Sequence, residues 1–342
     1  MTYDNTGTTI SEATLTLDQN WTTSGIKSLS LYFRGAAGNK GQLYVKIGSQ
    51  PQNAAAGGPI NNARVLYEGA AGDIAATQWV PWNIDLAAVG TNLSQVTSLT
   101  IGVEGAGAKG ILYVDDIRIY PKTPELLTPV DPGKTGLLAE YLFDNGANDS
   151  SGKGHHGTLL DNAQVADSFL LLDGVDDAVA IPRLGGANAA FTRCTYSMWM
   201  NSVRDPATAG IIGGINSNNW TTGGIHCKLY NGRANAGINA LAGGDMNGRT
   251  VVKPDEWVHL ALTVSDTVAI LYLNGQAEAS RGVTTPLTMF LGNGSIGAWN
   301  NNSDIQRELT GKMDDVRIYD RAVSEAELLW LAGKRAPVHK PF

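Results

Sequence analysis

Hydrophobic and polar residues alternate along most of the chain in short runs. In the first part of the sequence such runs occupy residues 28–35, 42–48, 63–69, 96–105 and 111–120, and each is closed by glycine or a polar cluster. Side chains on a strand point alternately to its two faces, so this spacing is typical of strands with one buried face. The pattern predicts short antiparallel strands joined by tight turns.

The alternation resumes after residue 136. Asn274 and Gly275 separate two of the later runs, and they can supply the two positive-φ residues of a type I′ turn, which predicts a hairpin. One segment has a convincing helical pattern, VSEAELLWLAG at 323–333, with Ser324 and Glu327 spaced as a capping box. The later runs are LLAEYLFD, SFLLLDG, AVAIP, TYSMWMNSV, GIIGGIN, GIHCKLYNG, WVHLALTV, TVAILYLNGQAEAS and GKMDDVRIYD.

A proline-rich segment divides the two sets of runs. Residues 121–136 hold four prolines, a composition typical of linkers. The 342-residue length also favours two hydrophobic cores over one. We therefore expect an all-β protein with two β-sandwich (jelly-roll) domains in tandem and a short helix on the second. The expected boundaries are 1–122 for the first domain, 123–135 for the linker and 136–342 for the second domain.

Composition narrows the classes of partner. A net charge of −7 and a pI near 5.2 argue against binding to nucleic acid, because the sequence contains no cluster of basic residues that could bind phosphate groups. No window of 18 apolar residues occurs, so the sequence predicts no membrane-spanning helix. Cys194 and Cys227 lack the spacing of a zinc or redox motif, and they could form one disulfide or remain two buried thiols.

The second half resembles the laminin-G-like, concanavalin A-type jelly rolls of bacteria. The resemblance rests on six segments in order, and it implies a jelly-roll sandwich in a secreted glycan-binding protein. We expect an extracellular or cell-surface location and further domains in a larger chain, although the sequence begins without a signal peptide. The segments are LLAEYLFDNGANDSSGKGHHGTL, LLDGVDDAVAIP, FTRCTYSMWMN, EWVHLALTV, ILYLNGQ and GKMDDVRIYDRAVSEAEL.

The first half resembles the galactose-binding-like β-sandwiches of bacterial glycan-degrading proteins. The segments that carry this looser resemblance are NWTTSGIKSLSLYFRG, WVPWNIDL and LYVDDIRIY. Such domains usually begin with one more strand, so we expect the first domain to be trimmed at its N-terminal side.

Two strands with nearly the same sequence, YVDDIRIY and KMDDVRIY, stand near the ends of the two halves. In a regular strand Asp115 shares a face with Ile117, and Asp314 shares a face with Val316. A core-facing carboxylate is costly unless it is paired or bound to a cation. Because Ca²⁺ prefers such oxygen ligands, the pattern predicts one structural calcium per domain, at Asp115 and at Asp314.

The resemblance supports this prediction, because both families often hold a structural calcium against an aspartate of the last strand. In the second domain two polar loops could add ligands, most plausibly Asp149 and Asp173. The alternative is that the paired aspartates accept hydrogen bonds from turn amides or pair with arginines.

Three tryptophans lie in polar loops and are candidates for sugar-stacking platforms. Trp220 and Trp299 are predicted to bind a ligand in the second domain, and Trp21 in the first. The alternative is that these loops fold over a sheet edge and bury the indoles. The neighbouring asparagines predicted to read sugar hydroxyls are Asn218, Asn219, Asn300 and Asn301.

No catalytic constellation stands out in the sequence. Glycanases of this fold use two carboxylates on one strand face, and no such pair of glutamates is apparent. The sequence therefore favours a non-catalytic module that binds a polysaccharide or mediates adhesion. Two other functions stay open: a glycoside hydrolase or lyase with an unrecognised site, and a structural surface protein without a ligand.

Overall fold

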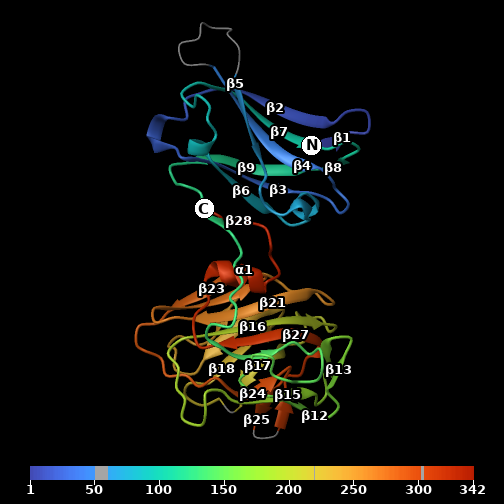
Figure 1. Ribbon diagram of the computed structural model, residues 1–342, viewed down its shortest axis with the longest axis vertical. Helices are drawn as coiled ribbons and strands as arrows, with labels where there is room; N and C mark the ends of the chain where they lie inside the picture. Colours follow the sequence, from blue (N-terminus) through green and yellow to red (C-terminus); the bar gives the residue numbers. More distant parts are fainter. Residues whose placement is uncertain (51–60, 219, 302–303) are drawn as a thin grey trace. The chain divides into compact units, whose positions relative to one another are not determined.

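The computed structural model describes residues 1–50, 61–218, 220–301 and 304–342. They form two compact units (Figure 1), Met1–Pro129 with Arg335–Phe342 and Val130–Lys334. The fold is all-β, with two sandwiches in series and one α-helix among the described residues, which confirms the predicted fold class. The division differs from the predicted boundaries at the C-terminus, because the last eight residues pack with the first unit.

The first unit is a sandwich of antiparallel sheets. Its strands are β1 (Thr2–Asp4), β2 (Ile10–Gln19), β3 (Ser28–Arg34), β4 (Gln42–Ser49), β5 (Asn61–Leu66), β6 (Val80–Asp85), β7 (Val96–Glu104), β8 (Lys109–Ile111), β9 (Tyr113–Tyr120), β10 (Leu126–Leu127) and β28 (Val338–His339). One sheet has the order β2-β7-β4-β5 and the other β6-β3-β9, while β1-β8 and β10-β28 are separate pairs. Leu31 and Trp82 from one sheet meet Val45 and Val103 from the other in the core.

The second unit is a larger sandwich. Its strands are β11 (Leu137–Tyr141), β12 (Thr158–Leu160), β13 (Gln164–Ala166), β14 (Phe169–Asp173), β15 (Ala178–Arg183), β16 (Cys194–Ser202), β17 (Ile211–Ser217), β18 (Ile225–Tyr230), β19 (Arg233–Ile238), β20 (Met246–Asn247), β21 (Trp257–Val264), β22 (Val268–Leu273), β23 (Gln276–Gly282), β24 (Gly292–Ile296), β25 (Trp299–Asn301), β26 (Asp304–Gln306) and β27 (Thr310–Tyr319). An eight-stranded sheet runs β13-β14-β27-β16-β21-β22-β23, with β11 also paired to β27. A seven-stranded sheet runs β12-β15-β24-β17-β18-β19-β20, and β25-β26 is a separate pair.

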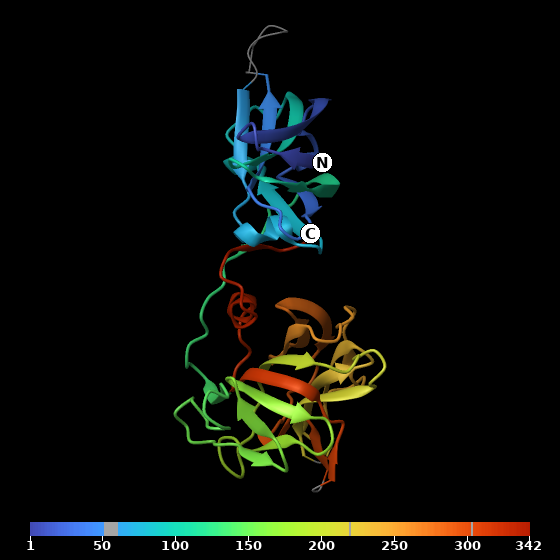
Figure 2. The ribbon, with the colours of Figure 1, turned by 90° about the vertical axis from the view of Figure 1, so that its right-hand side faces the viewer.

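Local sequence signals explain the predicted turn and helix. Asn274 and Gly275 have φ of +52° and +81° at the tip of the β22–β23 hairpin. The helix α1 (Glu325–Leu331, red in Figure 2) begins with the capping box of Ser324 and Glu327. Its apolar side packs against Ala261 and other residues on the face of the eight-stranded sheet that points away from the main core. Among the described residues no helix has the length and apolar character needed to cross a lipid bilayer.

The first Asp-Asp strand contains a β-bulge. Between β3 and β9, Tyr32 is aligned with Asp115 but Ser30 with Arg118, so β9 has one residue in excess. Asp116 takes up the excess with φ +50°, a left-handed conformation that aspartate tolerates better than most residues. The expectation that Asp115 faces the core is therefore wrong, and its side chain is exposed.

The second copy bends in the same way. The register of β16 against β27 shifts between Ser197 and Trp199, and Asp315 has φ +47°. Val316 is buried in the core, whereas Asp314 is only half-buried and lies on the opposite side of the strand from the core residue Met313. The bulge separates the first aspartate from the core face, because two successive residues occupy the space of one.

The hydrogen bonds of the two copies also agree. In each copy the amide of the second aspartate donates to the carboxylate of the first, at 2.8 Å in β9 and 2.7 Å in β27. The second carboxylate pairs with the arginine two residues later, Arg118 or Arg317, at 2.7 Å. Both contacts agree with the alternative interpretation, in which the paired aspartates accept hydrogen bonds from backbone amides and pair with arginines. Each copy of the motif thus forms a β-bulge.

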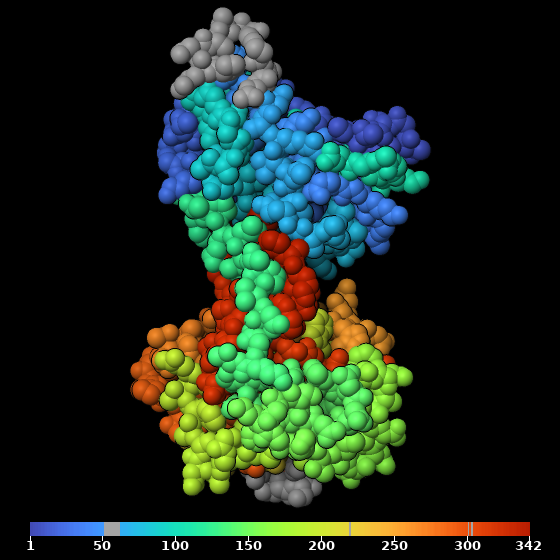
Figure 3. Space-filling view, in the orientation of Figure 1, coloured from blue at the N-terminus to red at the C-terminus, as the bar shows by residue number. Residues whose placement is uncertain are grey.

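The C-terminal tail completes the first unit. In β28, Val338 and His339 pair with β10, which places the last residues beside the segment that precedes residue 130 (Figure 3). His339 is 2% exposed, and its Nε2 lies 3.6 Å from a carboxylate oxygen of Glu68. The side-chain amide of Asn83 donates to the carbonyl of Lys340 at 2.8 Å.

Candidate functional site

A polar cluster lies on the side of β18 that points away from the sandwich core. Ile225, Cys227 and Leu229 alternate into the core, which directs His226 and Lys228 to the other face of the seven-stranded sheet. Side chains on such a face are usually exposed, yet these two are only 4% and 5% exposed. Other parts of the chain must therefore cover them.

Two of the tryptophans predicted from the sequence provide this cover. The Trp220 ring lies 4.2 Å from the His226 ring, and the Trp299 ring lies 5.4 Å from it on an edge-on contact. The indole of Trp299 donates to the carbonyl of Ser217 at 3.1 Å, and the side-chain amide of Asn239 donates to the carbonyl of Trp220 at 2.9 Å. These bonds connect both loops to the ends of the sheet strands.

Charged side chains close the remaining sides. The Arg307 guanidinium stacks over the Trp299 ring at 4.1 Å, and the Lys228 ammonium lies 3.3 Å from a carboxylate oxygen of Asp245. Together these groups form a cavity of about 280 Å³. An adjacent cavity of about 420 Å³ shares Trp220 and Asp245 as wall residues. The first cavity is lined by Ile211, Trp220, His226, Lys228, Asp245, Trp299 and Arg307.

Burial fixes the charge state of the cavity. It lowers the pKa of His226 to about 3, and the positive charges of Lys228 and Arg307 act in the same direction, so the imidazole is neutral at ordinary pH. Burial also lowers the pKa of Lys228, but the Asp245 carboxylate opposes that effect. With both cations charged, the cavity carries two positive groups against one carboxylate.

A glycine allows Trp220 and Asp245 to approach the sheet. A β-carbon on Gly237 would lie 2.3 Å from a carboxylate oxygen of Asp245 and 3.2 Å from the Trp220 ring. Any side chain here would displace one of these two walls. Gly237 therefore belongs to the site as a residue that makes room.

Two of the four predicted asparagines can be compared with the lining of the cavities. Asn218 and Asn301 are partly buried, and neither is among the residues that line the two cavities. Asn300 lies in β25, and Asn219 falls outside the described residues. The sequence interpretation missed His226, Lys228, Asp245 and Arg307. The sequence did contain a signal for His226 and Lys228, because both alternate with apolar residues on one strand and so share one face.

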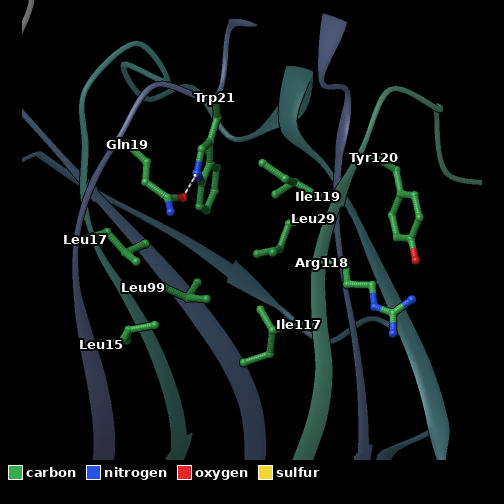
Figure 4. A pocket seen from close by; sticks show the side chains of 10 residues that line it. All are labelled: Leu15, Leu17, Gln19, Trp21, Leu29, Leu99, Ile117, Arg118, Ile119 and Tyr120. Carbon is green, nitrogen blue, oxygen red and sulfur yellow. Dashed lines mark hydrogen bonds between the residues drawn. The ribbon is translucent and has the colours of Figure 1, made fainter. Parts of the chain in front are cut away.

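Trp21 of the first unit is buried rather than displayed. It is 3% exposed, packs in the core and donates its indole N–H to the side chain of Gln19 at 2.8 Å. One edge of the ring reaches a groove of about 520 Å³ between β2 and β9 (Figure 4). The walls are mainly apolar, including Leu15 and Ile117, and Gln19, Arg118 and Tyr120 are the polar residues that line the groove.

The predicted metal ligands differ in their surroundings. The Asp149 carboxylate accepts hydrogen bonds from the backbone amides of Glu140, Ser151 and His155 at 2.9–3.0 Å, and from the Ser151 hydroxyl at 2.9 Å. Burial raises its pKa, but these bonds outweigh burial and lower it overall. Four donors thus satisfy this carboxylate without a cation, and calcium at Asp149 stays a prediction.

Calcium at Asp115 and Asp314 stays a prediction, now without the argument that these carboxylates face a core. Asp173 is different, because it lies in a group of aspartates with Asp176 and Asp177. Oxygen-only ligands of this kind suit Ca²⁺.

The comparison with known families concerns the second unit. Residues 173–329 match the family described as the concanavalin A-like lectin/glucanases superfamily. The predicted resemblance of the second half is thus confirmed, and this unit has a concanavalin A-like fold. No curated protein sequence matches the chain significantly. The galactose-binding-like resemblance of the first half stays a prediction.

Several solved structures are distantly similar. The receptor binding domain of botulinum neurotoxin D is 15% identical with a TM-score of 0.48, covering 58% of this chain and 53% of that chain. A botulinum neurotoxin serotype D ligand binding domain in complex with N-acetylneuraminic acid is 14% identical with a TM-score of 0.47, covering 58% and 51%. This chain thus spans about half the length of the toxin domains that it matches.

A third similar structure is Domain 4 of AbnA, a GH43 extracellular arabinanase from Geobacillus stearothermophilus, in complex with arabinotriose. It is 22% identical with a TM-score of 0.39, covering 57% of this chain and 98% of that chain.

Proposed function

We propose that the second unit binds a glycan in the cavity between Trp220 and Trp299. One observation carries the proposal: two indoles from separate segments of the chain converge over one cavity that also holds charged side chains. Apolar walls with a few converging polar groups are typical of small-molecule sites. An indole suits the apolar face of a pyranose ring, while Lys228 and Asp245 offer a donor and an acceptor for hydroxyl groups. The match to a superfamily of lectins and glucanases supports this proposal.

The charge of the cavity extends the proposal to the class of glycan. Lys228 and Arg307 together exceed the single carboxylate of Asp245 by one positive charge. Arginine in particular presents a planar fork of donors that matches carboxylate and sulfate groups. We therefore expect a preference for polysaccharides with acidic sugars over neutral polysaccharides.

The test is binding of the full chain to a panel of immobilised acidic and neutral polysaccharides, followed by calorimetry with oligosaccharides of each retained polymer. Trp220→Ala and Trp299→Ala should each lower the affinity at least about tenfold, a loss of about 1.4 kcal/mol. Tyr230→Ala is a matched control, because Tyr230 is an exposed aromatic residue on β18 outside the cavity. Wild-type binding by both tryptophan variants, or no retention on any polymer, would contradict the proposed site. Retention of neutral polymers alone would contradict the acidic preference.

Product analysis of each retained polysaccharide addresses the enzyme alternative. Among the described residues, Asp245 is the one carboxylate that lines the first cavity, whereas glycosidases usually pair two. Release of oligosaccharides would replace the binding function with a catalytic one. We also propose that the protein is secreted, that it mediates adhesion and that it is attached to further domains.

A further inference from the structure

The loop between β14 and β15 brings three aspartates together. Asp173 ends β14, and Asp176 and Asp177 directly precede β15. One carboxylate oxygen of each residue lies within 4.8 Å of the other two. Among the described residues, no lysine, arginine or histidine forms an ion pair with any of the three. The loop therefore concentrates negative charge without a protein cation.

The buried member of the group has an oxygen without a partner. Asp177 is 2% exposed, and its Oδ2 accepts a hydrogen bond from the Asp173 amide at 2.8 Å. Its Oδ1 is inaccessible to solvent and has no hydrogen-bond partner among the described residues. A buried carboxylate oxygen is costly in this state, because it has lost water and gained nothing in exchange. A bound cation would supply the missing partner.

The loop holds its shape through contacts of its own. Gly174 has φ +82°, and a β-carbon there would lie 1.9 Å from the Thr310 hydroxyl, so the backbone passes close against β27. The Val175 amide donates to Asp173 at 2.8 Å. Proximity of these carboxylates is thus a property of the folded backbone.

We propose that Asp173, Asp176 and Asp177 bind one Ca²⁺ ion. The three side chains offer only hard oxygen ligands, which suit Ca²⁺ and do not suit Zn²⁺, whose sites usually contain histidine or cysteine. Ca²⁺ also tolerates irregular geometry and completes its shell with backbone oxygens and water, as an exposed loop permits. The ion joins the end of β14 to the start of β15. This proposal rests on different residues from those of the glycan site and does not depend on it.

The experiment is calcium titration of the EDTA-treated full chain by calorimetry, combined with thermal unfolding in CaCl₂, MgCl₂ and NaCl of equal ionic strength. We expect one bound Ca²⁺ per chain and a rise in unfolding temperature of several degrees that Mg²⁺ and Na⁺ do not reproduce. Asp177→Asn and Asp176→Asn should each weaken calcium affinity at least about tenfold. Asp167→Asn is the matched control, since Asp167 is exposed in the turn between β13 and β14 and its substitution removes the same charge.

The Asp176→Asn variant separates a metal ligand from a structural residue. The Asp176 carboxylate accepts a hydrogen bond from its own backbone amide, which the side-chain oxygen of asparagine can also accept, and the substitution removes repulsion from the loop. In EDTA this variant should therefore unfold at the same temperature as the wild type or at a higher one. In calcium it should unfold at a lower temperature than the wild type in calcium. The proposal fails if the wild type shows no calcium-specific shift, if Mg²⁺ shifts it equally, or if Asp176→Asn binds Ca²⁺ as tightly as Asp167→Asn does.

Discussion

Trp220 packs against His226 with ring centroids 4.2 Å apart and ring planes inclined by 50°. The histidine is buried and neutral, so it gives the indole an apolar support instead of a mobile charge. Trp220 is nevertheless 40% exposed. The indole is thus fixed by the protein on one side while part of it faces solvent, which reduces the entropy that a ligand must remove on binding.

The two tryptophans should contribute differently to stability. Trp220→Ala removes a ring that packs on His226 but is 40% exposed, and we expect a loss of about 1 kcal/mol in the free energy of unfolding. Trp299→Ala removes the hydrogen bond to Ser217 and the stacking of Arg307, and we expect a loss of about 2 kcal/mol. Urea denaturation measures both values. Equal losses would show that Trp220 is a structural residue as much as Trp299.

Glycan affinity should be constant from pH 5 to pH 8 if His226 stays neutral as its pKa of about 3 requires. A change in affinity with a midpoint near the ordinary histidine pKa would contradict this state. Calorimetry in buffers across this range provides the measurement.

The same pKa affects stability in acid. Because the folded pKa of His226 is below the unfolded value, the unfolded chain binds more protons between about pH 6.5 and pH 3. The stability that neutral His226 provides is therefore complete above the unfolded pKa and is lost as the pH falls toward 3. His226→Gln should flatten the curve of unfolding free energy against pH in that window. Some slope should remain, since burial also lowers the pKa of His259 to about 3.

The bulge in β9 should reject β-branched residues at position 116. Asp116→Val should destabilise the first unit by about 1–2 kcal/mol, because φ +50° is strained for such a side chain. Asp116→Gly should cost much less, since glycine accepts this φ and the exposed pair with Arg118 contributes little. Ala13→Val, at an exposed position of β2 where the register with β7 is regular, controls for valine itself. In urea unfolding of the three variants, only Asp116→Val should show a large loss in the free energy of unfolding.

Removal of residues 335–342 should destabilise the first unit, although these residues follow the second unit in sequence. The truncation deletes β28 and buried His339, and it leaves the side-chain amide of Asn83 without the Lys340 carbonyl. We expect a loss of about 2 kcal/mol or more in the transition of the first unit. Thermal unfolding measures it, with His339→Ala as the milder comparison. An unchanged first transition would mean that the tail adds nothing to this unit.

Both cysteines should react with a thiol reagent only after unfolding. Cys194 and Cys227 are free thiols in the core of the second unit, which decides between the two possibilities that the sequence left open. Burial raises the pKa of both thiols and so removes the reactive thiolate. Titration with an aromatic disulfide reagent should give no reaction in native buffer and two equivalents in denaturant. Fewer than two equivalents under denaturing, non-reducing conditions would indicate a disulfide.

Local periodicity was enough to predict many of the strands, the Asn274–Gly275 hairpin, the capped helix and the loop position of Trp220, but Trp299 lies in the short strand β25 and the strand β2 was missed. These features depend on the alternation of side chains and on the dihedral preferences of a few residues, which neighbours in sequence determine.

The tertiary structure decided the rest. The bulges at Asp116 and Asp315 arise from the register with neighbouring strands, so an argument from alternation alone gave the first aspartates a core-facing position that they lack. The grouping of Lys228, Asp245 and Arg307 and the return of the tail to the first unit join residues distant in sequence. Such contacts form only when the sheets pack. Burial and charge at a site depend on segments that are distant in sequence, and local sequence does not determine which of them come into contact.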